Sequence, residues 1–122
     1  MSSQEEKSEK LQLSVEDRMQ RIKAIRARIA ELDLVCSGSI LERMKVCGKP
    51  NCRCAKTPPV LHGPYFEWSW PEGGHLAHKI VSREQADVIR RSIDNYHEIK
   101  NLIDQWKAET KAIVEMMNIR KP

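Results

Sequence analysis

Apolar side chains in the first third of the chain recur in steps of three and four. They are Leu11, Val15, Ile22, Ile25, Ile29, Leu32 and Cys36. This spacing is the heptad repeat of a coiled-coil helix, and only Arg18 interrupts it. We therefore predict a helix within residues 11–35. Ser14 and Asp17 resemble a capping box, so the regular turns should begin there and run to about Leu34.

The middle of the chain changes to the alternating pattern of strands. Gly38 ends the first helix, and residues 40–46, 65–70 and 75–81 alternate in the period of two that a half-buried strand requires. The turn 71–74 contains Pro71 and two glycines, which favours a hairpin between the last two strands. A loop is predicted from Cys47 to Pro64, because its prolines disfavour helix and central strand.

The middle predicted strand is rich in aromatic residues. Phe66, Trp68 and Trp70 share one face, and Tyr65 lies on the other with Glu67 and Ser69. A sheet with few aliphatic residues needs the first three in its core. Tyr65, Trp68 and Trp70 would stack on nucleic-acid bases wherever their strand face is open.

A second long helix is predicted over residues 83–118. Ser82 and Gln85 form a capping box at its start, and no glycine or proline interrupts it. Its apolar positions again follow a heptad pattern. They are Ile89, Tyr96, Ile99, Ile103, Trp106, Ile113 and Met117.

These elements predict an α+β fold, in which two long heptad-patterned helices flank a small three-stranded antiparallel sheet with a Cys-rich loop. Residues 1–10 read as a disordered tail and 11–122 as a single domain, with a small β subdomain at 38–81. The helices pair either within one chain or between chains as a homodimer. No apolar run is long enough for a membrane span, and residues 1–10 lack a signal core, so we expect a cytoplasmic protein without membrane contacts.

Positive charge is concentrated in two short stretches without acids. Residues 18–28 and 43–56 together contain ten of the 21 basic residues, although the net charge of the chain is only +4. This asymmetry favours a polyanionic partner, with nucleic acid ahead of membrane. A solvated helix face is the alternative explanation of the first stretch.

Three of the four cysteines crowd into the run 47–54. Clustered cysteines in a chain without an export signal favour zinc over disulfides. We predict a structural Zn site bound by Cys47, Cys52, Cys54 and His62, with Cys36 as the alternative fourth ligand. The other interpretation is a set of reduced thiols in a loop stiffened by prolines.

The same residues carry a family resemblance. Gly38-Ser39-Ile40, Arg43, the run Cys47-Gly-Lys-Pro-Asn-Cys-Arg-Cys-Ala55, His62-Gly-Pro-Tyr-Phe66 and the Gly73-Gly74 hairpin resemble a family of small prokaryotic proteins with a CGKPxCxCA…HGPYY signature. The resemblance covers about residues 37–100. It implies the order strand, cysteine loop, aromatic strand, hairpin and long helix, and it implies accessory proteins of mobile genetic elements.

Two functions are consistent with this sequence. The first is a DNA-binding accessory protein whose basic loop contacts the phosphate backbone. Its candidate contacts are Arg43, Lys45, Lys49, Arg53, Lys56, Arg21 and Arg28. The second is an adaptor that binds a recombinase or transposase through its helices. No catalytic constellation is recognisable, so we do not expect an enzyme.

Overall fold

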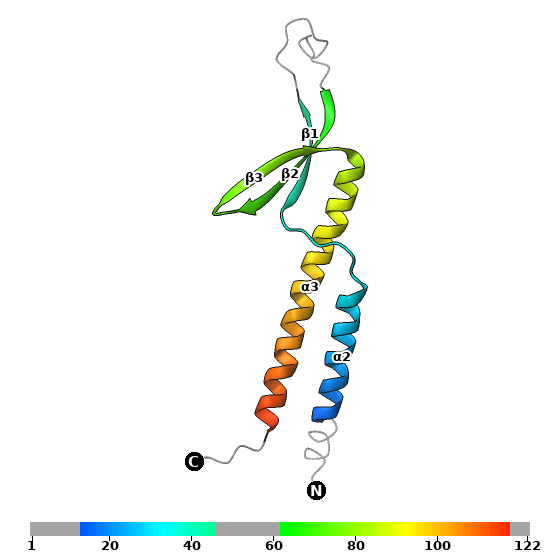
Figure 1. The fold of residues 1–122 in the computed structure, drawn as a ribbon, viewed down its shortest axis with the longest axis vertical. Coiled ribbons are helices and arrows are strands. Elements are labelled where there is room, and N and C mark those ends of the chain that lie inside the picture. Colours follow the sequence, from blue (N-terminus) through cyan, green and yellow to red (C-terminus); the bar gives the residue numbers. More distant parts are fainter. Residues whose placement is uncertain (1–12, 46–61, 118–122) are drawn as a thin grey trace, which may run out of the picture. The chain divides into compact units, whose positions relative to one another are not determined.

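The computed structural model describes residues 13–45 and 62–117, and its element order is helix, three strands, helix (Figure 1). The elements are α2 (Val15–Glu31), β1 (Ser39–Lys45), β2 (His62–Glu72), β3 (His75–Val81) and α3 (Arg83–Met116). Two helices and one antiparallel sheet confirm the predicted α+β class.

The chain divides into two compact units. The helical unit contains Met1–Asp33 and Glu98–Pro122, and the sheet unit contains Leu34–His97. α2 therefore belongs to the helical unit and the three strands to the sheet unit. The residues of α3 up to His97 belong to the sheet unit, and those from Glu98 onward belong to the helical unit.

The sheet has the order β1-β2-β3, and both pairs of strands are antiparallel (Figure 1). β3 has its predicted bounds, but β2 is longer than predicted and includes Pro64 and Pro71. Pairing with β3 begins only at Phe66, and pairing with β1 ends at Ser69. Each proline thus lies where β2 has only one neighbouring strand. At such an edge position the missing backbone N–H of proline interrupts no hydrogen bonding between strands. The prediction of a loop as far as Pro64 was wrong for this reason.

The core of the sheet unit forms between β2, β3 and the start of α3. Phe66, Val81 and Ala86 are buried, and Ile40, Trp68 and Ile89 pack against them. Trp68 also stacks on Trp70, with 4.2 Å between the ring centroids. The predicted placement of Phe66, Trp68 and Trp70 on one packed face is therefore correct.

Gly38 lies where the chain enters the sheet, and no other residue type fits there. Its φ is +108°, and an added Cβ would lie 1.9 Å from the carbonyl oxygen of Ser69. Both the backbone conformation and the close approach therefore require glycine. The predicted helix stop at this position is in fact a packing requirement of the sheet.

The segment before Gly38 packs directly on α3. The backbone N–H of Cys36 donates to the carbonyl oxygen of Ser92, and the Asn95 side-chain amide donates to the carbonyl oxygen of Leu34. Ser92 is buried, and its hydroxyl donates to the Val88 carbonyl within the helix at 2.7 Å. A small side chain at 92 allows this approach, which explains the polar interruption in the predicted heptad pattern.

α2 begins at the predicted capping box. The Ser14 hydroxyl accepts from the Asp17 N–H at 3.0 Å, and the Asp17 carboxylate accepts from the Ser14 N–H. The helix ends at Glu31, earlier than predicted, because its C-cap residue Leu32 is already extended. Ile22 and Ile25 are its buried residues.

Ion pairs join α2 to α3 within the chain. Arg18 and Arg21 both donate to the Glu109 carboxylate, at 2.8 and 3.3 Å, and Arg28 forms a bidentate pair with Glu98. Residues 99, 102, 106, 109, 113 and 116 of α3 are partly buried. Ile103 and Met117, which the sequence assigned to the heptad face, are instead 44% and 58% exposed.

Candidate nucleic-acid interface

The sheet has one packed face and one open face. Cross-strand pairing places the open-face residues next to one another. These residues are Ser39, Leu41, Arg43, Tyr65, Glu67, Ser69, Leu76, His78 and Ile80. Leu41, Leu76 and Ile80 are each more than half exposed, so the sheet unit presents a largely uncovered surface.

A cluster of polar side chains occupies the centre of this face. Glu67 accepts from Arg43 at 3.0 Å with one carboxylate oxygen, and its other oxygen lies 3.3 Å from Nδ1 of His78. The Glu67 side chain is 20% exposed, whereas those of Arg43 and His78 are each 52% exposed. A hollow of about 250 Å³ lies among these three residues, Lys79 and Ile80. Glu67 orients Arg43 while several guanidinium N–H groups stay available to a ligand.

Ser69 completes the cluster without forming a catalytic triad. Its hydroxyl lies 2.9 Å from Nδ1 of His78, the same ring nitrogen that faces Glu67. In a Ser–His–acid triad the hydroxyl and the carboxylate contact opposite ring nitrogens. This cluster is therefore suited to binding and not to activation of the serine.

The ends of β1 and β2 frame the cysteine segment. Lys45, the last residue of β1, pairs with His62, the first residue of β2. The chain therefore leaves the sheet and returns to it at neighbouring positions, next to Arg43 on the open face. Cys47, Cys52, Cys54, Lys49, Arg53 and Lys56 lie outside the described residues.

The family comparison covers α2, the three strands and the cysteine segment 46–61. A family model described as "Domain of unknown function (DUF6788)" matches residues 14–91. The chain belongs to the DUF6788 family. No curated protein and no solved structure matches the chain. The DUF6788 match begins at the N-cap of α2 and ends within α3, so it includes the whole open face.

Cys36 of the DUF6788 region precedes β1, and the cysteine segment 46–61 follows that strand in the sequence. The Cys36 thiol donates to the Ile89 carbonyl oxygen at 3.7 Å, and burial raises the pKa of this thiol. A protonated thiol that already has a partner on α3 is a poor zinc ligand, because zinc binds the thiolate. These features argue against Cys36 as the alternative fourth ligand of the predicted zinc site.

The two helix arginines among the candidate DNA contacts have structural partners in the chain. Arg21 shares Glu109 with Arg18, and Arg28 contacts both Glu98 and Glu31. The hydrogen bond from Arg28 lowers the pKa of Glu98, and the hydrogen bonds from Arg18 and then Arg21 lower the pKa of Glu109. A phosphate would therefore compete with a carboxylate for Arg21 and Arg28. In the same helix Lys23 and Arg26 have no ion pair with a described residue.

Sequence reasoning missed Glu67, Ser69 and His78 as one group. The alternation in 65–70 already placed Glu67 and Ser69 beside Tyr65 on one face. The Gly73-Gly74 turn fixes the register that pairs Ser69 with His78. Counting back from the turn would therefore have found the cluster. His78 is exposed, yet it contacts two polar side chains.

Metal sites and membrane spans are not found in the described part of the DUF6788 protein. Across residues 13–45 and 62–117, no three His, Cys, Asp or Glu side chains come together to hold a metal ion. Among the same residues, no helix has both the length and the apolar content needed to cross a membrane.

Proposed function

We propose that the protein is a DNA-binding accessory protein of a mobile element, as the signature resemblance implies. We propose that it binds the phosphate backbone through the open sheet face and the adjoining basic segment 46–61. The observation that carries the proposal is the Lys45–His62 pairing, which joins this segment to the face that carries Arg43. Phosphate contacts from such a surface give binding that is independent of sequence and sensitive to salt.

The open face supplies a mixed surface for a nucleic-acid strand. Arg43 is oriented by Glu67, and Tyr65 is its cross-strand neighbour on the same face. Trp68 and Trp70 belong to the packed face, so Tyr65 is the aromatic residue of β2 placed to contact a base. The acid-free stretch from Arg43 to Phe66 adds Lys45, Lys49, Arg53 and Lys56 as phosphate ligands.

We propose that zinc orders the basic segment. Cys47 follows Lys45 by two residues, and His62 pairs with Lys45, so these two ligands enter the segment from neighbouring strand ends. Cys52 and Cys54 would complete four protein ligands, a set that leaves no open coordination position and serves structure. Elemental analysis of protein purified without added metal should find one zinc per chain. Less than about a third of a zinc per chain, with circular dichroism unchanged by chelator, would contradict the site.

Fluorescence anisotropy with labelled duplex and single-stranded DNA across salt concentrations tests the DNA proposal. The double variant Lys49→Ala with Arg53→Ala should weaken binding to all sequences and reduce the salt slope by about one unit per lost phosphate contact. Lys23→Ala with Arg26→Ala is the matched control, because it removes the same charge from α2 without breaking an ion pair between described residues. Weakening by the Lys23 and Arg26 pair with no effect of the Lys49 and Arg53 pair would move the contact to the first helix. The absence of wild-type binding at about 50 mM salt would contradict the proposal.

A protein-interaction adaptor is the second candidate, with a recombinase or transposase as the predicted partner. The exposed apolar residues of the helical unit favour it, since DNA binding does not require them. A homo-oligomer joined through α2 and α3 also stays a prediction. Light scattering decides the latter, because a mass near 14.1 kDa would show that the two helices pair within one chain alone.

A further inference from the structure

The two sides of the α2–α3 pair in the helical unit differ in character. One side carries the ion pairs, and a groove there is lined by Arg21, Ala24, Ile25, Gln105, Ala108 and Glu109. On a helix of 3.6 residues per turn, Met19 and Arg26 lie on the side of α2 opposite to Arg21 and Ala24. By the same spacing Ile103 and Thr110 lie on the side of α3 opposite to Gln105 and Ala108.

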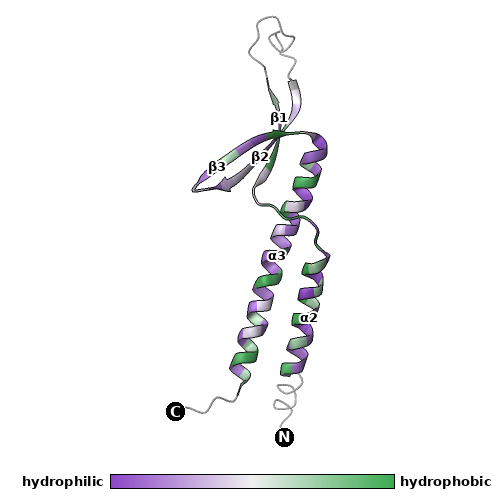
Figure 2. Cartoon of the chain, in the orientation of Figure 1, coloured by the Kyte–Doolittle hydropathy of each residue, from purple (hydrophilic) through white to green (hydrophobic). Residues whose placement is uncertain are grey.

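Among the described residues of the helical unit, the large exposed apolar side chains all lie on this second side. They are Val15, Met19, Ile103, Val114 and Met117, with exposed fractions from 41% to 58%. On α3 the positions 103, 106, 110, 114 and 117 advance in steps of three and four, so they form one continuous stripe. Green bands that mark apolar residues recur along both helices in Figure 2. We call this side the apolar face.

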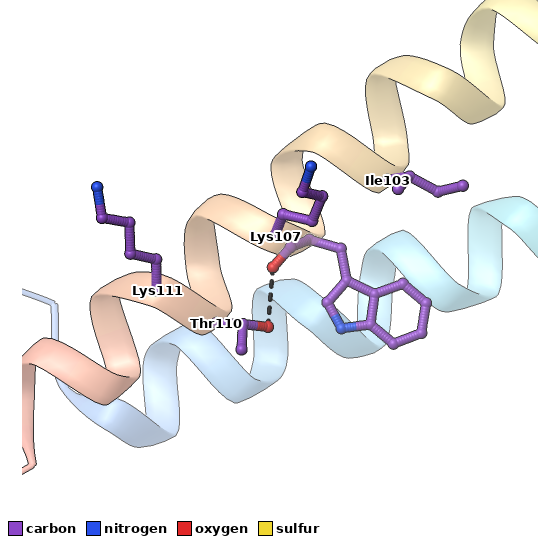
Figure 3. A pocket seen from close by; sticks show the side chains of 5 residues that line it. Ile103, Lys107, Thr110 and Lys111 are labelled. Atoms are coloured by element: carbon purple, nitrogen blue, oxygen red, sulfur yellow. Dashed lines mark hydrogen bonds between the residues drawn. The ribbon is translucent and has the colours of Figure 1, made fainter.

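A groove runs along the α3 part of the apolar face. Its volume is about 590 Å³, and its lining residues are Ile103, Trp106, Lys107, Thr110 and Lys111 (Figure 3). The Thr110 hydroxyl donates to the Trp106 carbonyl oxygen at 3.0 Å, so it is satisfied within α3 and adds no unpaired donor to the groove. The groove is thus apolar at its base and bordered by two lysines.

Charge on the apolar face has one dominant sign. Lys107 and Lys111 border the groove on α3, where Lys111 also lies 4.0 Å from Glu115. Lys23 and Arg26 lie on the same side of α2, where they outnumber the acid Glu16. The acids Glu98 and Glu109 are on the opposite side, where they pair with arginines. A second copy of the chain docked on this face would oppose like charges, whereas an acidic helix would complement them.

We propose that the apolar face binds an amphipathic helix with acidic flanks from a partner protein, which would pack beside α2 and α3 as a third helix. Helix-in-groove recognition uses anchors at the same three- and four-residue steps that the stripe provides. α2 has 17 residues. A helix of that size is about 25 Å long, so the partner segment needs roughly five turns. This proposal does not depend on DNA binding, since the face belongs to the helical unit and the proposed DNA contacts belong to the sheet unit and segment 46–61.

Isothermal titration calorimetry with two synthetic helices tests the proposal. Both peptides have three heptads with leucine at the core positions. One carries glutamate at the flanking positions, and the other carries lysine there. The full-length protein should bind the glutamate peptide and not the lysine peptide. Lys107→Glu with Lys111→Glu should weaken the glutamate peptide roughly tenfold and create binding of the lysine peptide.

Variants of exposed residues separate the apolar contribution from the charge. Ile103→Ser should weaken the glutamate peptide roughly fivefold or more, because a central anchor is lost. Leu76→Ser is the matched control, since Leu76 is 56% exposed on the open face of the sheet. Circular dichroism of both variants checks that the helices are retained.

Three outcomes would overturn the proposal. Equal affinity for the two peptides would show that the face does not select acidic flanks. A doubled mass in light scattering that Ile103→Ser abolishes would assign the face to a second copy of the chain. Binding to phosphatidylserine vesicles that Ile103→Ser abolishes, without peptide binding, would assign it to a membrane surface.

Discussion

The sheet unit and the helical unit are stabilised in different ways. In the sheet unit an aromatic ring and small aliphatic residues form a buried core, and guanidinium groups of Arg83 and Arg90 lie 5.2 and 5.6 Å from the Phe66 ring centroid. In α2 of the helical unit the buried residues are Ile22 and Ile25, and charged pairs connect that helix to α3. The arginines paired with Glu98 and Glu109 therefore have a structural role in the helical unit, whereas the proposed DNA contacts belong to the sheet unit and segment 46–61.

The largest effect is expected where the sheet core is removed. Phe66→Ala should lower the free energy of unfolding of the sheet unit by about 3–5 kcal/mol, because it leaves a cavity and removes the partner of two arginines. Ile25→Ala should cost less, since two packed helices can close around the smaller side chain. Urea unfolding followed by tryptophan fluorescence and circular dichroism measures both. Equal losses would show that the two units depend on apolar packing to the same degree.

A smaller effect is expected at Gly38. Gly38→Ala should cost about 1–3 kcal/mol or more, because it adds strain at a positive φ to a clash with the Ser69 backbone. Gly74→Ala is a matched control, since Gly74 also has a positive φ but nothing lies within 4 Å of an added Cβ. Thermal unfolding compares the two. A similar loss in both variants would mean that the close approach at Gly38 contributes nothing.

The caps of the two helices provide a finer comparison. Ser14→Ala and Ser82→Ala each remove a capping box and should each cost about 1 kcal/mol. Ser14→Ala acts on α2 of the helical unit, where little buried area compensates the loss, so it should lower helix content more. Circular dichroism at 222 nm measures this directly. A larger loss of helix from Ser82→Ala would reverse the ranking.

Acid should weaken the helical unit by a small amount. The pKa values of Glu98 and Glu109 lie below the ordinary 4.5 in the folded chain, so their stabilisation is fully present above that pH. It is lost as the pH falls through the lowered pKa values. Glu98→Gln with Glu109→Gln should remove this part of the pH dependence in thermal unfolding. Glu115→Gln should not, because Glu115 pairs with Lys111 inside α3.

The bounds of helices and strands were predictable wherever residues close in sequence determine them. The capping boxes at Ser14 and Ser82 and the bounds of β3 follow from short-range chemistry, and the structure confirms them. The role of Ser92 was not predictable, because it depends on the packing of the segment before β1 on α3. The choice between Leu102 and Ile103 as the packed residue depends on the angle between two helices, which a one-dimensional pattern does not contain.

The candidate site was predictable in composition and not in arrangement. Arg43 was named from its charge, but its pairing with Glu67 requires the register between β1 and β2. The same limit applies to Arg21 and Arg28. The sequence predicted both as DNA contacts because they lie in a basic stretch, and in the structure both form ion pairs with glutamates. A stretch of like charges in the sequence does not show which acidic residues of a distant helix will pair with it in the fold.

The pairing of Lys45 with His62 makes the intervening segment replaceable. Because neighbouring strands hold the two ends about 5 Å apart, a short turn of two to four residues can connect them. Shortening a loop between fixed ends also lowers the entropic cost of its closure, by about 0.6 kcal/mol per halving. A chain with 46–61 exchanged for such a turn should keep its sheet register. The same position would accept an unrelated peptide, so the sheet unit can serve as a scaffold for displaying inserted sequences.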